Sequence, residues 1–252
     1  MDLVSEPFHF LVVLAAGILA GAGNTVAGGG TILSFPILVW MGLPEQIANA
    51  TNTLGLLAGS GGGAWSYRGR IRGQKGWELL WVPALLGGAL GAVLLLVLPP
   101  DWFVTAAPWL VIGSAGLVAA DPLIRRHLSA FAPGERPMRT SLAALFLVAI
   151  YGGYFGAGIG ILVLFTLRLV GVADLHDANG LKNLLVTGIK GVAAVGFIMS
   201  GVVVWSVALI MIVGSTLGGW GAGRLIQKVD QNELRWIVVA TGIAMGVIMM
   251  LG

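Results

Sequence analysis

The chain has no cysteine and few charged residues. The absence of cysteine among its 252 residues excludes disulfides, thiolate metal sites and persulfide relays. Only 10% of the residues are charged, whereas an average soluble domain carries about 25%. With 57% hydrophobic residues, the chain has too little polar surface to cover a water-facing globule. The net charge of +3 comes from basic residues in short segments between apolar runs, so we expect no nucleic-acid partner.

Apolar runs of about 16 to 22 residues recur along the chain, and such runs are typical of helices that cross a lipid bilayer. No basic residue precedes the first run and no small-residue cleavage site follows it, so it does not resemble a signal peptide. We therefore predict an all-α, polytopic membrane protein. Two long runs with glycine-rich interruptions occupy 8–42 and 141–171. The expected transmembrane helices cover 47–66, 77–98, 102–120, 179–199, 205–223 and 236–251.

The second half of the chain resembles the first at an offset of 130 residues. The glycines at 28–30 fall on the GIG at 158–160, and ANATNTL at 48–54 falls on ANGLKNL at 178–184. Several matches at one offset indicate an internal duplication. The predicted units are a first repeat at 1–122, a cytoplasmic linker at 123–140 and a second repeat at 141–252.

Segment 8–42 is too long for one straight span. About 35 helical residues would extend about 52 Å, against a hydrocarbon core of about 30 Å. We expect two short half-helices that meet at the glycines and form a re-entrant hairpin, and a second such hairpin at 141–171. Each repeat then makes three net crossings, so that the two repeats are inverted.

The basic residues favour this inverted arrangement. Parallel repeats would place Arg224, Lys228 and Arg235 outside, against the positive-inside rule, whereas inverted repeats place them in the cytoplasm. The inverted arrangement also puts two other basic groups inside: Arg68, Arg70, Arg72 and Lys75, and Arg125, Arg126, Arg136 and Arg139. The segments left outside contain neither Lys nor Arg: 1–7, 43–46, 99–101 and 200–204.

The two glycine-rich interruptions form the first part of the predicted substrate site. Many secondary transporters place non-helical backbone at a midplane site, where glycines expose backbone amides and half-helix N-termini attract anions. The alternative is close helix packing, which explains small-xxx-small pairs such as Gly17/Gly21 and Gly214/Gly218 more simply. The predicted contacts are Asn24, Thr25, Gly28, Gly29, Gly30, Thr31, Gly156, Gly158 and Gly160.

A polar helical face in 179–199 forms the second part. The face consists of Asn179, Asn183, Thr187 and Lys190, whose spacings of four, four and three residues place them on one side of a helix. Lys182 lies beside this face. A lysine within a span is treated as functional by default, although Lys182 is close enough to the cytoplasmic end to snorkel. The first repeat carries a matching stripe. The predicted contacts are Asn179, Lys182, Asn183, Thr187 and Lys190, with Asn49, Asn52 and Thr53 in the first repeat.

All eleven acidic residues fall in loops or at span ends, which leaves no carboxylate for proton or sodium coupling. Two lysines without a countercharge suit an anionic substrate. An anion leaving a negative-inside cell moves downhill by about 2.3 kcal/mol per charge per 100 mV, so export needs no coupling ion. We predict a secondary transporter of a small anion, with an anion-selective channel as the alternative. The three histidines lie at segment ends or in loops, so we expect no enzyme active site, metal site or cofactor.

At these residues the chain resembles the TauE/SafE family, also called the 4-toluene sulfonate uptake permease family. The resemblance lies in GAGNTVAGGGTILSFPILVWMGLPEQIANATNTL, in the small-residue run ending in YRGR, and in a weaker second copy, GAGIGILVLFTL and ANGLKNLLVTGIKG. It implies a multi-pass transporter of the bacterial inner membrane. The implied substrates are sulfite, sulfoacetate and other sulfur-containing or organic anions, often moved outward.

Overall fold

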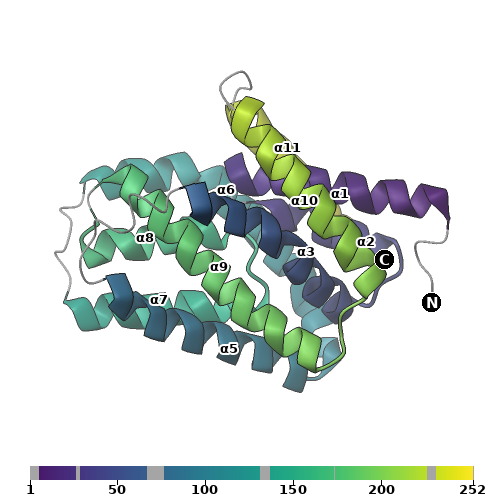
Figure 1. Cartoon of the computed structure of the whole chain (residues 1–252), viewed down its shortest axis with the longest axis horizontal. Coiled ribbons are helices and arrows are strands. Elements are labelled where there is room, and N and C mark those ends of the chain that lie inside the picture. The colour runs from purple at the N-terminus through teal and green to yellow at the C-terminus, as the bar shows by residue number, and fades with distance from the viewer. Residues whose placement is uncertain are drawn as a thin grey trace.

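The structure, a computed structural model, describes residues 6–26, 29–66, 77–130, 137–172, 174–225 and 231–251. Within these ranges the chain is helical and contains no β-strand, which confirms the predicted fold class. The first half contains α1 (Pro7–Val26), α2 (Gly30–Trp40), α3 (Glu45–Ser66), the 3-10 helix η1 (Trp77–Leu80), α5 (Trp81–Val97) and α6 (Pro100–Ala130). The second half contains α7 (Met138–Tyr154), α8 (Ile159–Val170), α9 (Leu175–Met199), α10 (Trp205–Leu225) and α11 (Gln231–Leu251) (Figure 1).

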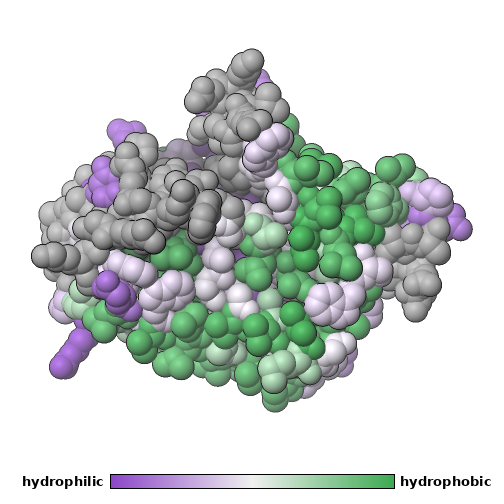
Figure 2. All heavy atoms as spheres, in the orientation of Figure 1, coloured by the Kyte–Doolittle hydropathy of each residue, from purple (hydrophilic) through white to green (hydrophobic). Residues whose placement is uncertain are grey.

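The outside of the protein is apolar and its centre is partly polar. Large side chains such as Trp109 and Leu147 are 67% and 65% exposed, and hydrophobic residues cover much of the face seen in Figure 2. Asn49, Asn52 and Lys190, in contrast, are buried. Such a distribution fits a protein surrounded by lipid. Among the described residues, four helices are long and apolar enough to cross a membrane: Pro7–Asn24, Trp77–Val97, Pro100–Ile124 and Asp177–Met199.

Both glycine-rich segments are interrupted, as the sequence predicts, and in each the two flanking helices pack against each other. The arms of these hairpins are unequal, which the sequence did not indicate. In the first, α1 has 20 residues and is itself a candidate span of about 30 Å, whereas α2 has 11. In the second, α7 has 17 residues and α8 has 12. Helix α6 also continues to Ala130, so the start of the expected linker is helical.

The packing of the two halves is reciprocal. Each helix of the first half has a counterpart about 130 residues later: α7 for α1, α8 for α2, α9 for α3, α10 for α5 and α11 for α6. Helix α1 packs on α10, and correspondingly α7 packs on α5; α3 packs on α10, and α9 on α5. Two further contacts join corresponding helices directly: α3 packs on α9, and α6 packs on α11. Each hairpin is therefore held by a helix from the other half of the chain, and α3 and α9 meet at the centre.

Small residues make these close crossings possible. A Cβ at Gly21 of α1 would overlap the backbone of Ser215 in α10, and a Cβ at Gly218 would overlap the carbonyl of Ile18. The Ser215 hydroxyl donates a 2.7 Å hydrogen bond to the carbonyl oxygen of Gly55 in α3. Close packing is therefore the observed role of these small-xxx-small glycines, as the simpler interpretation of the sequence predicts.

Candidate functional site

The first break, between α1 and α2, is closed by an asparagine. Asn24, in the last turn of α1, accepts a 3.0 Å hydrogen bond at Oδ1 from the amide of Gly30, the first residue of α2. A Cβ at Gly30 would lie 2.7 Å from Asn24 Oδ1, and a Cβ at Gly29 would lie 2.7 Å from Val238 Cγ1. These two glycines therefore allow close packing here, and their contact with a ligand stays a prediction. Gly28 and the side chain of Thr25 lie outside the described part of the structure.

Helix α3 contacts the N-terminal half of α2 through Asn52. Ser34 donates from its hydroxyl to Asn52 Oδ1 and also lies 3.1 Å from the Gly30 carbonyl oxygen, to which it can donate. The carboxamides of Asn24 and Asn52 thus both accept hydrogen bonds at Oδ1 from the first two turns of α2. Their Nδ2 atoms are buried and have no hydrogen-bond partner in the described structure. Thr31, which follows Gly30, and Thr53, which follows Asn52, are also buried, with 2% and 5% of their surface exposed.

The second break, between α7 and α8, depends on left-handed backbone. Gly156 and Gly158 have φ angles of 73° and 68°, which side chains with a Cβ rarely adopt. The Tyr151 hydroxyl donates a 2.6 Å hydrogen bond to the carbonyl oxygen of Ala157, and lies 2.8 Å from the Ser114 hydroxyl of α6. Tyr151 and Ser114 therefore support the turn. Neither residue was predicted from the sequence.

Helix α3 also contacts the second break. Asn49 donates from Nδ2 to the carbonyl oxygen of Tyr154, the last residue of α7, at 2.8 Å. Asn49 is fully buried, and its Oδ1 has no hydrogen-bond partner in the described residues. The ring of Phe155, inside the break, packs edge-on against Phe35 of α2 with ring centres 5.3 Å apart. The two breaks are therefore neighbours, joined by α2 and by one face of α3.

Helix α9 brings two lysines to the second break. Lys190 is only 3% exposed, and its Cε lies 3.5 Å from the position a Cβ of Gly156 would take. No hydrogen bond or ion pair joins its ammonium group to another residue in the described ranges. Lys182 packs its Cδ 3.4 Å from the corresponding position at Gly160 and donates to Asn179 Oδ1 at 3.2 Å. The ammonium group of Lys190, which is unpaired in the described ranges, would attract a negatively charged ligand.

Thr187, another predicted residue of α9, faces the neighbouring helix α3. Thr187 donates to the carbonyl oxygen of Asn183 within the helix at 2.7 Å. Its methyl group lies 3.9 Å from where a Cβ of Gly61 in α3 would be, so it faces the contact between the two central helices. No group of three or more His, Asp or Glu residues able to hold a metal ion occurs in the described residues.

Broken helices, buried polar groups and an apolar exterior define a multi-pass membrane protein of the transporter class. The family model described as sulfite exporter TauE/SafE matches residues 13–249, and the chain belongs to this family. This confirms the resemblance seen in the sequence.

Curated relatives cover nearly the whole chain. A probable membrane transporter protein ORF9 of Sinorhizobium sp is 28% identical, over 95% of this chain and 92% of the relative. A probable membrane transporter protein of Haemophilus influenzae is 25% identical, over 90% and 89%. The probable membrane transporter protein YfcA of Escherichia coli K12 is 26% identical, over 95% and 89%. No solved structure matches the chain.

Proposed function

We propose that this chain is a secondary transporter that carries a small sulfur-containing or organic anion, such as sulfite or an organosulfonate, across the bacterial inner membrane. The observation that carries the proposal is Lys190, a buried ammonium group without a partner in the described structure, beside the left-handed Gly156 of a broken helix. A bound anion would supply the missing countercharge. The relatives' names support the class of membrane transporter and do not specify the substrate.

The reciprocal packing of the two halves supports an inverted repeat that works by alternating access. Inverted-repeat transporters hold substrate between their repeats and expose it to each side in turn. Here α3 and α9, which carry the predicted polar residues, face each other at the centre. Rocking at this contact would open the site to one side and close it to the other.

The charges at the site support export. No carboxylate is buried among the described residues, so no acidic side chain is available to bind a coupling proton or sodium ion. An anion moves outward from a negative-inside cell without coupling, by about 2.3 kcal/mol per charge per 100 mV.

Replacing Lys190 tests the site. In proteoliposomes, Lys190→Gln should lower kcat/KM for sulfite or a small organosulfonate by about 10- to 100-fold, because a hydrogen bond to a charged group contributes about 1.5–3 kcal/mol. The same variant should not melt at a lower temperature, since it removes an uncompensated buried charge. Arg139→Gln, an exposed residue at the start of α7, is the control and should transport normally. Unchanged flux in Lys190→Gln would refute the assignment of Lys190 to the substrate site. Single-channel currents in a planar bilayer would show that the protein is an anion channel and not a carrier.

A further inference from the structure

Three buried phenylalanine rings join the two breaks. Phe35 of α2 packs edge-on against Phe155, which lies inside the second break, with ring centres 5.3 Å apart. The ring of Phe103, from α6, lies 6.1 Å from each of them, and all three side chains are at most 2% exposed. We call Phe35, Phe103 and Phe155 the aromatic gate. Because its rings come from three separate elements, the cluster exists only while α2, α6 and the second break stay together.

The aromatic gate is reached from the outer end of the bundle. Phe103 is in the first turn of α6 and follows the segment 99–101, which the positive-inside rule places outside the cell. Its neighbour Trp102 is 63% exposed, whereas Phe103 is 1% exposed. The Phe103 ring therefore lies just beneath the outer surface and contacts the rings of both breaks from that side.

Hydrogen bonds of α3 tie together the same end of the protein. Gln46, in the first turn of α3, donates from Nε2 to the carbonyl oxygen of Leu95 in α5 at 2.9 Å. Thr51 accepts a 3.1 Å hydrogen bond from the amide of Val204, just before α10. Asn49 donates to the last carbonyl before the second break at 2.8 Å. The outer half of α3 is therefore bonded to three other parts of the bundle.

Residues that correspond in the two repeats differ in exposure. At the offset of 130 residues, Phe35 corresponds to Phe165 and Asn49 to Asn179, so each pair is identical in sequence. Phe35 is fully buried and Phe165 is 42% exposed, while Asn49 is fully buried and Asn179 is partly exposed. In the inverted topology, the buried member of each pair belongs to the outer half and the exposed member to the inner half. The outer half is therefore packed more tightly than the inner half.

The contact between α3 and α9 is more exposed toward its cytoplasmic end. Thr187 of α9 lies there opposite Gly61 of α3, and both residues are partly exposed. Ser60 of α3 and Asn183 of α9 are also partly exposed, whereas Asn52, in the outer half of α3, is fully buried. Polar side chains within a span face the bundle interior or a water-filled cavity. We therefore expect water to enter this contact from the cytoplasm.

We propose that the structure is the inward-facing state of the carrier, and that the aromatic gate is the barrier that closes it to the outside. For the anion to leave, Phe103 separates from Phe35 and Phe155, and the inner halves of α3 and α9 close on each other. The inference rests on the alternating access of the proposed function. It adds which end is closed and which side chains close it.

Single cysteines test the state, because the chain contains none. Thr187→Cys places a thiol at a partly exposed inner position, and Ser34→Cys places one at a fully buried residue next to Phe35. An impermeant maleimide should label position 187 in inside-out vesicles and not in right-side-out vesicles. In right-side-out vesicles it should label position 34 only slowly.

Removing one ring tests the gate. In right-side-out vesicles, Phe103→Ala should raise the labelling rate of Ser34→Cys by about 10- to 100-fold, because Phe103 loses its ring contacts with Phe35, Phe155 and Tyr154. Trp102→Ala is the matched control, since it removes an adjacent but exposed ring, and it should leave the rate unchanged. Phe103→Leu keeps an apolar side chain and should give a smaller increase, so the test stands if the alanine variant fails to fold.

The outcomes separate the gate from the proposed function, because labelling needs no substrate. An unchanged labelling rate at position 34 in both Phe103 variants would overturn the gate. Labelling of position 187 from the outside alone would overturn the inward-facing assignment. The expected labelling without flux of sulfite or an organosulfonate in proteoliposomes would support the gate and overturn the proposed substrate class.

Discussion

Replacing Gly218 with alanine should destabilise the protein by loosening the crossing of α1 and α10. The added Cβ would overlap the carbonyl of Ile18, a backbone group that cannot rotate away. Relief requires the two helices to separate, and such overpacking costs about 1–3 kcal/mol. A loss of about 2 kcal/mol lowers the melting temperature of a chain of this size by about 4–8 °C. Thermal unfolding in detergent, followed by tryptophan fluorescence, measures this shift.

The same helix provides the control. A Cβ at Gly221 would meet no atom within 4 Å, so Gly221→Ala adds no clash. Alanine also favours the helix over glycine by about 0.5–1 kcal/mol, so this variant should melt at or slightly above the temperature of the unchanged protein. If Gly218→Ala and Gly221→Ala have the same melting temperature, the close crossing of α1 and α10 does not depend on glycine at position 218.

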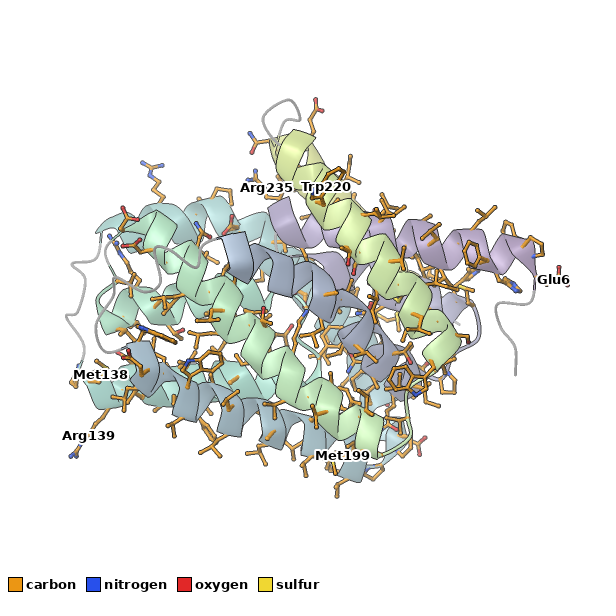
Figure 3. All side chains as sticks on the ribbon, viewed as in Figure 1. Glu6, Met138, Arg139, Met199, Trp220 and Arg235 are labelled. Atoms are coloured by element: carbon orange, nitrogen blue, oxygen red, sulfur yellow. The ribbon has the colours of Figure 1, made fainter. Side chains whose placement is uncertain are left out.

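Two further predictions concern the second break and the topology. Tyr151→Phe removes the hydroxyl that joins Ala157 and Ser114, which should cost about 1–3 kcal/mol and slow anion flux; Tyr154→Phe, whose hydroxyl makes no hydrogen bond in the described structure, should do neither. Because the chain has no cysteine, Ser200→Cys and Arg139→Cys each introduce a single thiol. Figure 3 shows Arg139 and Met199, the neighbour of Ser200, well apart. In intact cells an impermeant maleimide should label residue 200 and not residue 139, and the reverse pattern would contradict the inside placement of the basic segments.

Much of the candidate site was predictable because its signals are local. Glycine clusters inside apolar runs indicate where a helix stops, and the structure ends α1 at Val26 and α7 at Tyr154. A lysine in the middle of an apolar span indicates an unusual charge, and Lys190 is indeed buried. Ser34 and Ser114 could not be predicted. Each is a small hydroxyl residue in an apolar run, and its role comes from partners 18 and 37 residues away.

The sequence alone determined the membrane class, the helical fold and the two interruptions, because hydropathy, helix length and glycine content are properties of short stretches of chain. Only the tertiary structure decided how each polar group is used. It turned Gly29 and Gly30 toward neighbouring helices, engaged Oδ1 of Asn24 and Asn52, and left their Nδ2 atoms and the Lys190 ammonium without partners in the described structure. The physical reason is that a buried hydrogen bond joins atoms from separate helices, so whether it forms depends on how those helices pack.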